Sequence, residues 1–181
     1  MSDTNRGLIE LRGEDSLKFL QGQVSCDLHQ LSDDNFIRGC HCTPKGRVIF
    51  LFSAGLKDSD CIVLETHPSI VDTAIASLKK YAVFSKTKIT DISDQKLSIE
   101  PELSDLDRLR AGIADITSGT TDQFIPQMLN LDLLNFISFN KGCYTGQEVV
   151  ARAHYLGAVK RRMYLLNLST DCVPEIGQAL F

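Results

Sequence analysis

The segment at residues 141–148, Lys-Gly-Cys-Tyr-Thr-Gly-Gln-Glu, gathers more chemically committed side chains than any other stretch of the chain. Thr145 and Glu148 have the T-x-x-E spacing of a capping box, in which each side chain satisfies a free backbone amide at a helix start. We therefore expect a helix from Thr145 to about Leu156. Gly157 would end it.

Cys143 is the first candidate for a functional residue, because it directly precedes this predicted helix. The free amides of a helix start and the charge of Lys141 would both favour a thiolate. The alternative is a buried, inert thiol. A Gly-Cys-Tyr sequence before a helix is typical of a loop, so we expect Cys143 to be accessible.

Basic residues follow in the segment 141–162, which carries five cations against one acid, a net charge of +4. Arg152 lies four positions after Glu148, so it either forms a surface ion pair or faces an anionic ligand. With Lys160, Arg161 and Arg162 it would suit the carboxylates of a ligand. The alternative for the whole run is a solvated charged face.

Two further side chains of residues 141–148 have open roles. Tyr144 either stacks on a flat heterocycle or packs against the helix. Gln147 lies in the predicted first turn, where its amide either faces a ligand or is exposed. Capping accounts for Glu148 without any catalytic role.

The composition describes an ordinary globular protein. The chain has 181 residues, an apolar fraction of 43%, and 19 basic against 23 acidic residues, for a net charge of −4. This net negative charge argues against a protein that coats nucleic acid along its length. No apolar run reaches the roughly 20 residues that span a bilayer, and the N-terminus lacks a signal core, so we expect a cytoplasmic protein without a membrane partner.

The six cysteines are expected to be reduced, because the chain is large and lacks a secretory signal. Cys40-His41-Cys42 offers three adjacent ligand types. On a strand, however, the two cysteines share a face while His41 points away, which leaves two ligands where zinc prefers four. We therefore expect packed thiols and no metal.

The pattern of elements predicts an α+β fold with a mainly antiparallel sheet. Strands are expected at 7–12, 36–42, 47–52, 61–66, 85–92 and 162–168, and helices at 14–23, 68–81, 103–111 and 145–156. The polar, acidic segment 94–107 reads as a connection. We expect a first lobe at 1–93, a second at 94–161 and the start of a further unit at 162–181.

Several motifs together resemble the YgfZ family of folate-binding proteins, which are related to the aminomethyltransferases of glycine cleavage. The residues 141–148 are the most specific of them. Five further stretches agree in order along the chain: 11–25, 41–47 (His-Cys-Thr-Pro-Lys-Gly-Arg), 78–86 (Leu-Lys-Lys-Tyr-Ala-Val-Phe-Ser-Lys), 110–113 and 123–127.

The resemblance implies a tetrahydrofolate-binding accessory protein that supports iron–sulfur cluster assembly or repair, and thereby tRNA modification. Its partners would be a reduced folate and iron–sulfur enzymes or assembly proteins, with transient contact to a cluster and indirect contact to tRNA. Cys143 would be the essential thiol. As residues that contact the folate we predict Lys141, Gly142, Tyr144, Gln147, Arg152, Arg161 and Arg162.

Two alternatives remain open at this point. A folate-dependent aminomethyltransferase would place a carboxylate shortly after Gly46, yet the residues that follow are Arg-Val-Ile-Phe-Leu-Phe. None of them can act as a general acid or base, so we favour a binding protein over an enzyme. Direct tRNA binding through the cations at 152–162 is the other alternative.

The chain departs from the family in two ways. The connection between Ile92 and Arg110 is shorter than expected, and the chain stops at Phe181, where relatives continue into a C-terminal β-barrel. We therefore expect a compact or truncated version of the aminomethyltransferase-like fold, with residues 162–181 as the start of an incomplete barrel.

Overall fold

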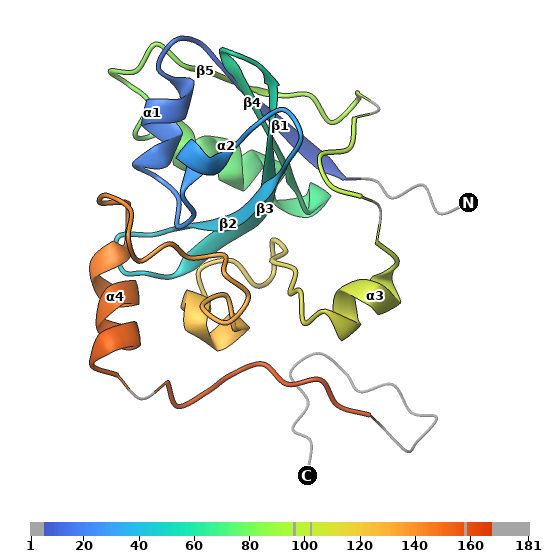
Figure 1. Cartoon of the computed structure of the whole chain (residues 1–181), viewed down its shortest axis with the longest axis vertical. Helices are drawn as coiled ribbons and strands as arrows, with labels where there is room; N and C mark the ends of the chain where they lie inside the picture. Colours follow the sequence, from blue (N-terminus) through green and yellow to red (C-terminus); the bar gives the residue numbers. More distant parts are fainter. Residues whose placement is uncertain (1–5, 96, 102, 158, 168–181) are drawn as a thin grey trace.

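The computed structural model describes residues 6–95, 97–101, 103–157 and 159–167. It is an α+β fold built on one five-stranded sheet in which every neighbouring pair is antiparallel (Figure 1). This confirms the predicted fold class. The order is β2-β3-β4-β1-β5, and the strands are β1 (Gly7–Arg12), β2 (Ile37–Cys42), β3 (Val48–Asp58), β4 (Cys61–Thr66) and β5 (Lys88–Asp91).

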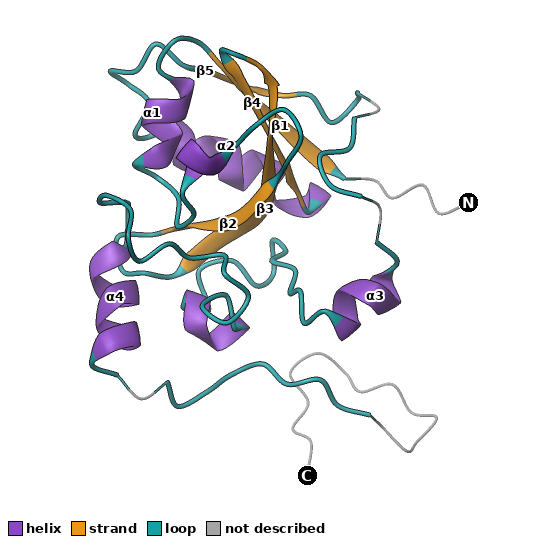
Figure 2. Cartoon of the chain, in the orientation of Figure 1, coloured by secondary structure: helices purple, strands orange, loops and turns teal. Residues whose placement is uncertain are grey.

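In the described residues, four α-helices and three short 3₁₀ turns accompany the sheet (Figure 2). The predicted helix at 68–81 begins with a 3₁₀ turn, because Pro68 sets the first turn and the backbone tightens there. The elements are α1 (Ser16–Gln21), η1 (Leu28–Gln30), η2 (Pro68–Ile70), α2 (Val71–Lys79), α3 (Asp105–Arg110), η3 (Pro126–Leu129) and α4 (Gln147–Tyr155).

The main core lies between one face of the sheet and helices α1 and α2. In β1 the alternation of a strand directs Ile9 and Leu11 to this face, and both are fully buried. Phe50 and Phe52 of β3 join them, with Leu78 from α2. The antiparallel register, Gly7 opposite Thr66 and Arg12 opposite Cys61, sets this alternation across the centre of the sheet.

The opposite face of β2 and β3 is covered by the second half of the chain. Cys40, Cys42 and Val48 pack there with a cluster that includes Leu131 and Val150. The two thiols therefore serve as core residues on one face of β2, as predicted, while His41 is buried on the other. Residues 114–150 have little regular structure but are fixed by this apolar contact.

Glu100 fastens the connection between the two halves of the chain to the sheet. Its carboxylate is almost fully buried and accepts hydrogen bonds from Ser53 Oγ at 2.9 Å, Arg38 Nε at 2.7 Å and Arg108 Nη1 at 3.1 Å. Arg6 completes the set at 3.3 Å. Although burial raises the pKa of Glu100, Ser53 and the arginines leave it lowered overall. The polar connection expected at 94–107 thus contains a buried anchor.

The strand predicted at 162–168 is wrong for residues 162–167, which adopt no regular secondary structure. They form an extended segment held by single contacts: Met163 N donates to Met128 O at 2.9 Å, and Asn130 Nδ2 donates to Met163 O at 2.8 Å. Without a neighbouring strand, an alternating pattern alone cannot form a ladder. Residues 168–181 lie outside the described part, so the predicted start of a barrel stays a prediction.

Candidate functional site

The residues Lys141–Gly146, here called the thiol loop, lead directly into α4. The predicted capping box is wrong. The N-cap is Gly146 in a left-handed conformation with φ of +84°, and no side chain caps the helix. Thr145 instead donates from Oγ1 to Gln23 Oε1 at 3.0 Å, while Glu148 accepts from Arg152. Contacts to a distant loop have replaced the local capping pattern.

Lys141 fastens the thiol loop to the connection between α1 and β2. Its ammonium group donates to three backbone carbonyls, those of Gln21 at 2.7 Å, Val24 at 2.8 Å and Cys26 at 2.6 Å. Burial lowers the pKa of Lys141 to about 8, so the ammonium still prevails at pH 7. Its charge, which we expected to favour a thiolate at Cys143, is directed at these carbonyls.

Tyr144 takes the packing role of its two predicted alternatives. The side chain is buried and its ring lies 5.4 Å from Lys141 Nζ. Burial raises the pKa of its hydroxyl, which has no hydrogen-bond partner among the described residues. The backbone of the next residue adds a contact, because Thr145 N donates to Gly22 O at 3.3 Å.

Two glycines interlock the thiol loop with the turn between β2 and β3. A Cβ on Gly146 would lie 2.5 Å from Thr43 O and 3.0 Å from Cys42 Cβ. A Cβ on Gly46 would lie 2.7 Å from Val149 Cβ. Both glycines have positive φ, so their lack of a side chain serves conformation and close approach together. Gly46 therefore serves both the turn and the packing contact with α4.

Cys143 is exposed at the tip of this fixed loop, as predicted. The four other cysteines in the described part, Cys26, Cys40, Cys42 and Cys61, are buried. Burial raises the pKa of Cys26 to about 12 and that of Cys61 to about 11, which disfavours their thiolates at neutral pH. Among these five thiols, Cys143 is the one that reagents and other proteins can reach.

The remaining residues predicted near the loop fall into distinct environments. Gly142 is exposed, and a Cβ added there would meet no atom within 4 Å, whereas Gln147 is half-buried at the start of α4. Arg152 is exposed and donates to Glu148 Oε1 at 3.0 Å, the i,i+4 ion pair that was one of its two alternatives. An exposed pair of this kind contributes little to stability.

Arg162 is held by acceptors of the protein itself. It forms two hydrogen bonds with Asp132, at 2.9 and 2.8 Å, and donates further to Asn130 Oδ1 and Gln127 O. Burial raises the pKa of Asp132, but the hydrogen bonds and charge of Arg162 leave it lowered overall. Arg162 thereby fixes the extended segment, whereas Arg161 is exposed.

A cavity of about 820 Å³ lies between this extended segment, η3 and the end of α3. Its lining combines apolar side chains, Leu109, Phe124, Met128, Met163 and Tyr164 among them, with three arginines, Arg47, Arg161 and Arg162. We call it the arginine-rimmed cavity. Its size and its mixture of a mostly apolar wall with a few cations suit a small ligand that carries an anionic group.

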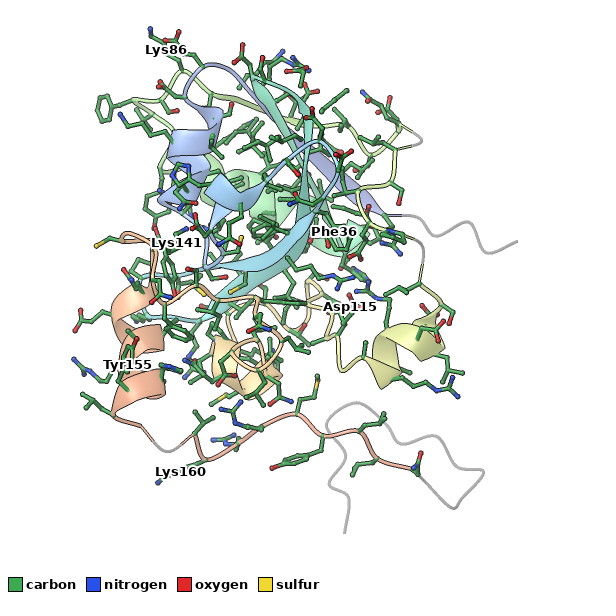
Figure 3. The ribbon with its side chains drawn as sticks, viewed as in Figure 1. Phe36, Lys86, Asp115, Lys141, Tyr155 and Lys160 are labelled. Carbon is green, nitrogen blue, oxygen red and sulfur yellow. The ribbon has the colours of Figure 1, made fainter. Side chains whose placement is uncertain are left out.

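The thiol loop does not line this cavity: none of residues 141–148 belongs to its wall. Figure 3 shows Lys141 at one end of α4 and Lys160 beyond the other. The structure therefore separates the candidate residues into an exposed thiol at one end of the helix and a cavity bordered by Arg161 and Arg162 at the other.

Sequence reasoning missed Asp115, the single acidic residue in the described wall of the cavity. Arg108 Nη2 donates to it at 2.9 Å. It also missed Arg47 as a wall residue, whose Nη1 donates to Gln123 O at 2.7 Å. The sequence offered position as the signal, since Arg47 ends the motif 41–47 and Asp115 lies two residues after the motif 110–113.

Neither a metal centre nor a membrane-spanning helix is present in the described part of the chain. It contains no cluster of three or more His, Cys, Asp and Glu side chains arranged to hold a metal ion. None of its helices combines the length and apolar character needed to cross a membrane.

Comparisons with known proteins identify the family. No family model matches the chain. A Haemophilus influenzae protein whose name assigns no function is 35% identical over 216 residues, covering 99% of this chain and 77% of its own. The tRNA-modifying protein YgfZ of Sodalis glossinidius is 32% identical, covering 96% of this chain and 72% of its own, and that of Escherichia coli O157:H7 is 32% identical, with 96% and 73% covered.

Among solved structures, the glycine cleavage system aminomethyltransferase T from Bartonella henselae aligns with a TM-score of 0.47 at 13% identity, over 50% of this chain and 25% of that one. The sequence relatives are the stronger finding, because their identity exceeds 30% over more than two thirds of their length. The chain belongs to the YgfZ family.

Proposed function

We propose that this chain is a tetrahydrofolate-binding accessory protein that supports iron–sulfur cluster assembly or repair, and through it tRNA modification, in the cytoplasm. The observation that carries the proposal is the separation of the exposed Cys143 from the arginine-rimmed cavity. An exposed thiol on a loop that Lys141 holds in place, outside the wall of the ligand cavity, is suited to act on another protein. Relatives of the chain are named tRNA-modifying protein, which agrees with an accessory role in tRNA modification.

The arginine-rimmed cavity fits a reduced folate. Phe124, Met128 and Tyr164 provide apolar and aromatic surface for a flat ring, and the exposed Arg161 can pair with a carboxylate of the glutamate tail. Arg162 contributes by holding the wall, since Asp132 already occupies its guanidinium. When bound, the folate would supply a carrier of one-carbon groups.

The thiol loop does not fit a resident iron–sulfur cluster, which needs several cysteine ligands. Cys143 supplies one thiolate, and the other cysteines of the described part are buried. In this proposal the cluster therefore belongs to the client protein, and Cys143 contacts the client or its cluster transiently.

Asp115 gives the aminomethyltransferase alternative its one specific support, because it places a carboxylate in the cavity wall. Arg108 already binds that carboxylate, and none of the six residues after Gly46 is acidic. Direct tRNA binding loses support from the geometry, since Arg152 and Arg162 are both paired with acids of the chain.

Titration with tetrahydrofolate tests the binding part of the proposal. We expect saturable binding that weakens with rising salt and with Arg161→Ala, and no transfer of an aminomethyl group. Lys160→Ala is the matched control, because Lys160 is an exposed neighbour that does not line the cavity. Absence of binding, or turnover that Asp115→Asn abolishes, would contradict it.

Cys143→Ala tests the thiol part. The side chain is exposed, so we expect normal folding, stability within about 0.5 kcal/mol of the parent and intact folate binding. In cells that lack the native protein, the variant should fail to restore iron–sulfur enzyme activity, whereas Leu133→Ser, at an exposed position outside the thiol loop and the cavity wall, should restore it. Full rescue by Cys143→Ala would refute a thiol mechanism.

A further inference from the structure

The loop between α2 and β5 presents an apolar tip to solvent. Its residues Val83 and Phe84 are 73% and 101% exposed. Every other phenylalanine in the described part of the chain is buried or half-buried. A fully exposed phenylalanine beside an exposed valine is an unfavourable arrangement in water, and such surfaces commonly mark interaction sites.

Backbone hydrogen bonds hold the tip in this position. Tyr81 N donates to Leu78 O at 3.0 Å, which closes a turn just before the tip, and Ser85 N donates to Ala82 O at 2.9 Å, which closes a second turn that contains Val83 and Phe84. The base is pinned by Lys86 N, which donates to Asp15 Oδ2 at 2.9 Å. Ala82 packs on the main core. These contacts therefore keep Val83 and Phe84 exposed to solvent.

Exposed lysines flank the tip on both sides along the sequence. Residues 79–88 contain four exposed lysines, Lys79, Lys80, Lys86 and Lys88, and no acid, which is a local charge of +4 on a chain of net charge −4. At the base of the loop, Glu14 pairs with Lys86. Lys18 on α1, four residues after Glu14, is exposed. Figure 3 shows Lys86 at the opposite end of the molecule from Lys160.

We propose that this tip docks into an apolar pocket on an acidic protein partner, with Phe84 as the anchor and the lysines as the rim. The inference rests on the proposed function, because an accessory protein that acts on clients needs a surface to hold them. Interfaces typically combine aromatic residues in an apolar core with a polar rim, and complementary charges at the rim guide the partner into place. Two apolar residues offer little area for insertion into a bilayer.

A first experiment identifies the partner. A photoreactive phenylalanine analogue is placed at position 84 of the full chain in cells, and crosslinked proteins are identified by mass spectrometry. We expect crosslinks to an acidic segment of a distinct protein. Crosslinks only to a second copy of this chain, or to no protein, would overturn the proposal.

A second experiment measures the interaction with the purified partner. We expect Val83→Ser with Phe84→Ser, and separately Lys79→Glu with Lys80→Glu, to weaken binding at least tenfold, and the lysine effect to shrink at high salt. Leu133→Ser is the matched control, because Leu133 is 67% exposed outside this loop. Unchanged affinity of the Val83 and Phe84 variant, or binding of the parent to vesicles of anionic phospholipid in place of the partner, would reject the docking surface.

The same variants separate this proposal from the proposed function. The serine variant should keep tetrahydrofolate binding and the alkylation rate of Cys143, because neither site includes the tip. Partner binding that depends on Phe84 would support docking even where Cys143→Ala rescues cells fully. Rescue by the serine variant with parental partner affinity would reject docking and leave the thiol role standing.

Discussion

Replacing Gly146 by alanine tests whether the thiol loop depends on its contact with the turn between β2 and β3. At φ of +84° an alanine is destabilised by about 1–2 kcal/mol relative to a right-handed conformation. Its Cβ would also lie 2.5 Å from Thr43 O and 3.0 Å from Cys42 Cβ. These are backbone and core atoms that cannot rotate away, and such overpacking costs about 1–3 kcal/mol. Together we expect a loss of about 2–5 kcal/mol in the free energy of unfolding.

Gly142→Ala is the matched control on the other side of Cys143. A Cβ there meets nothing within 4 Å, and Gly142 lacks a positive φ. Its stability should stay within about 0.5 kcal/mol of the parent. Urea unfolding of both variants measures the difference, and alkylation of the native proteins reports whether Cys143 keeps its environment. Equal unfolding midpoints for the two variants would refute the interlock of Gly146 with the turn.

Three further predictions concern buried charge. Burial lowers the pKa of His41 to about 4 against about 6.5 in an unfolded chain. As the pH falls, the unfolded state therefore takes up the proton first. The contribution of neutral His41 to the free energy of unfolding is complete above pH 6.5 and falls by about 2 kcal/mol by pH 4.5. Unfolding of His41→Phe, measured at both pH values, should lack this difference. Lys141→Met should lose about 2 kcal/mol and speed hydrogen exchange at the Thr145 amide, because three carbonyls lose a charged donor. Arg162→Ala should lower the melting temperature, since it leaves Asp132 uncompensated, whereas Arg161→Ala should not.

The sheet was predictable because its signals are local. Strand β4 has the predicted bounds, Cys61–Thr66, since a short apolar run between polar turns is typical of a buried strand. The prediction that Cys40 and Cys42 share a face away from His41 was confirmed for the same reason, because alternation in a strand is fixed by geometry. The exposure of Cys143 was predictable from the loop-forming residues around it.

The contacts that fix the thiol loop were not predictable, because each joins residues about a hundred positions apart. The T-x-x-E pattern predicted a capping box, but Thr145 bonds Gln23 and the left-handed Gly146 fits against Thr43. From the sequence we predicted that Lys141 favours a thiolate at Cys143 and contacts the folate. Its three acceptors are backbone carbonyls, which carry no residue-specific signal.

The arginines show the same limit on the cavity side. From the sequence, Arg161 and Arg162 were both predicted to bind the carboxylates of a ligand. In the extended segment successive side chains point to different sides, so Arg162 reaches the half-buried Asp132 while its neighbour Arg161 stays exposed. Which of two adjacent arginines is free for a ligand depends on the position of an aspartate thirty residues earlier. Tertiary structure alone decides that.

The turn between β2 and β3 contacts both candidate sites through adjacent residues. Gly46 packs against Val149 and lies beside Gly146 at the base of the thiol loop. Its neighbour Arg47 lines the arginine-rimmed cavity and is bonded to Gln123, another residue of that wall. The turn is itself closed by two backbone hydrogen bonds, Gly46 N to Thr43 O and Thr43 N to Arg47 O, each at 2.8 Å. Adjacent residues of one closed turn therefore contact the two candidate sites, Arg47 in the cavity wall and Gly46 beside Gly146 of the thiol loop.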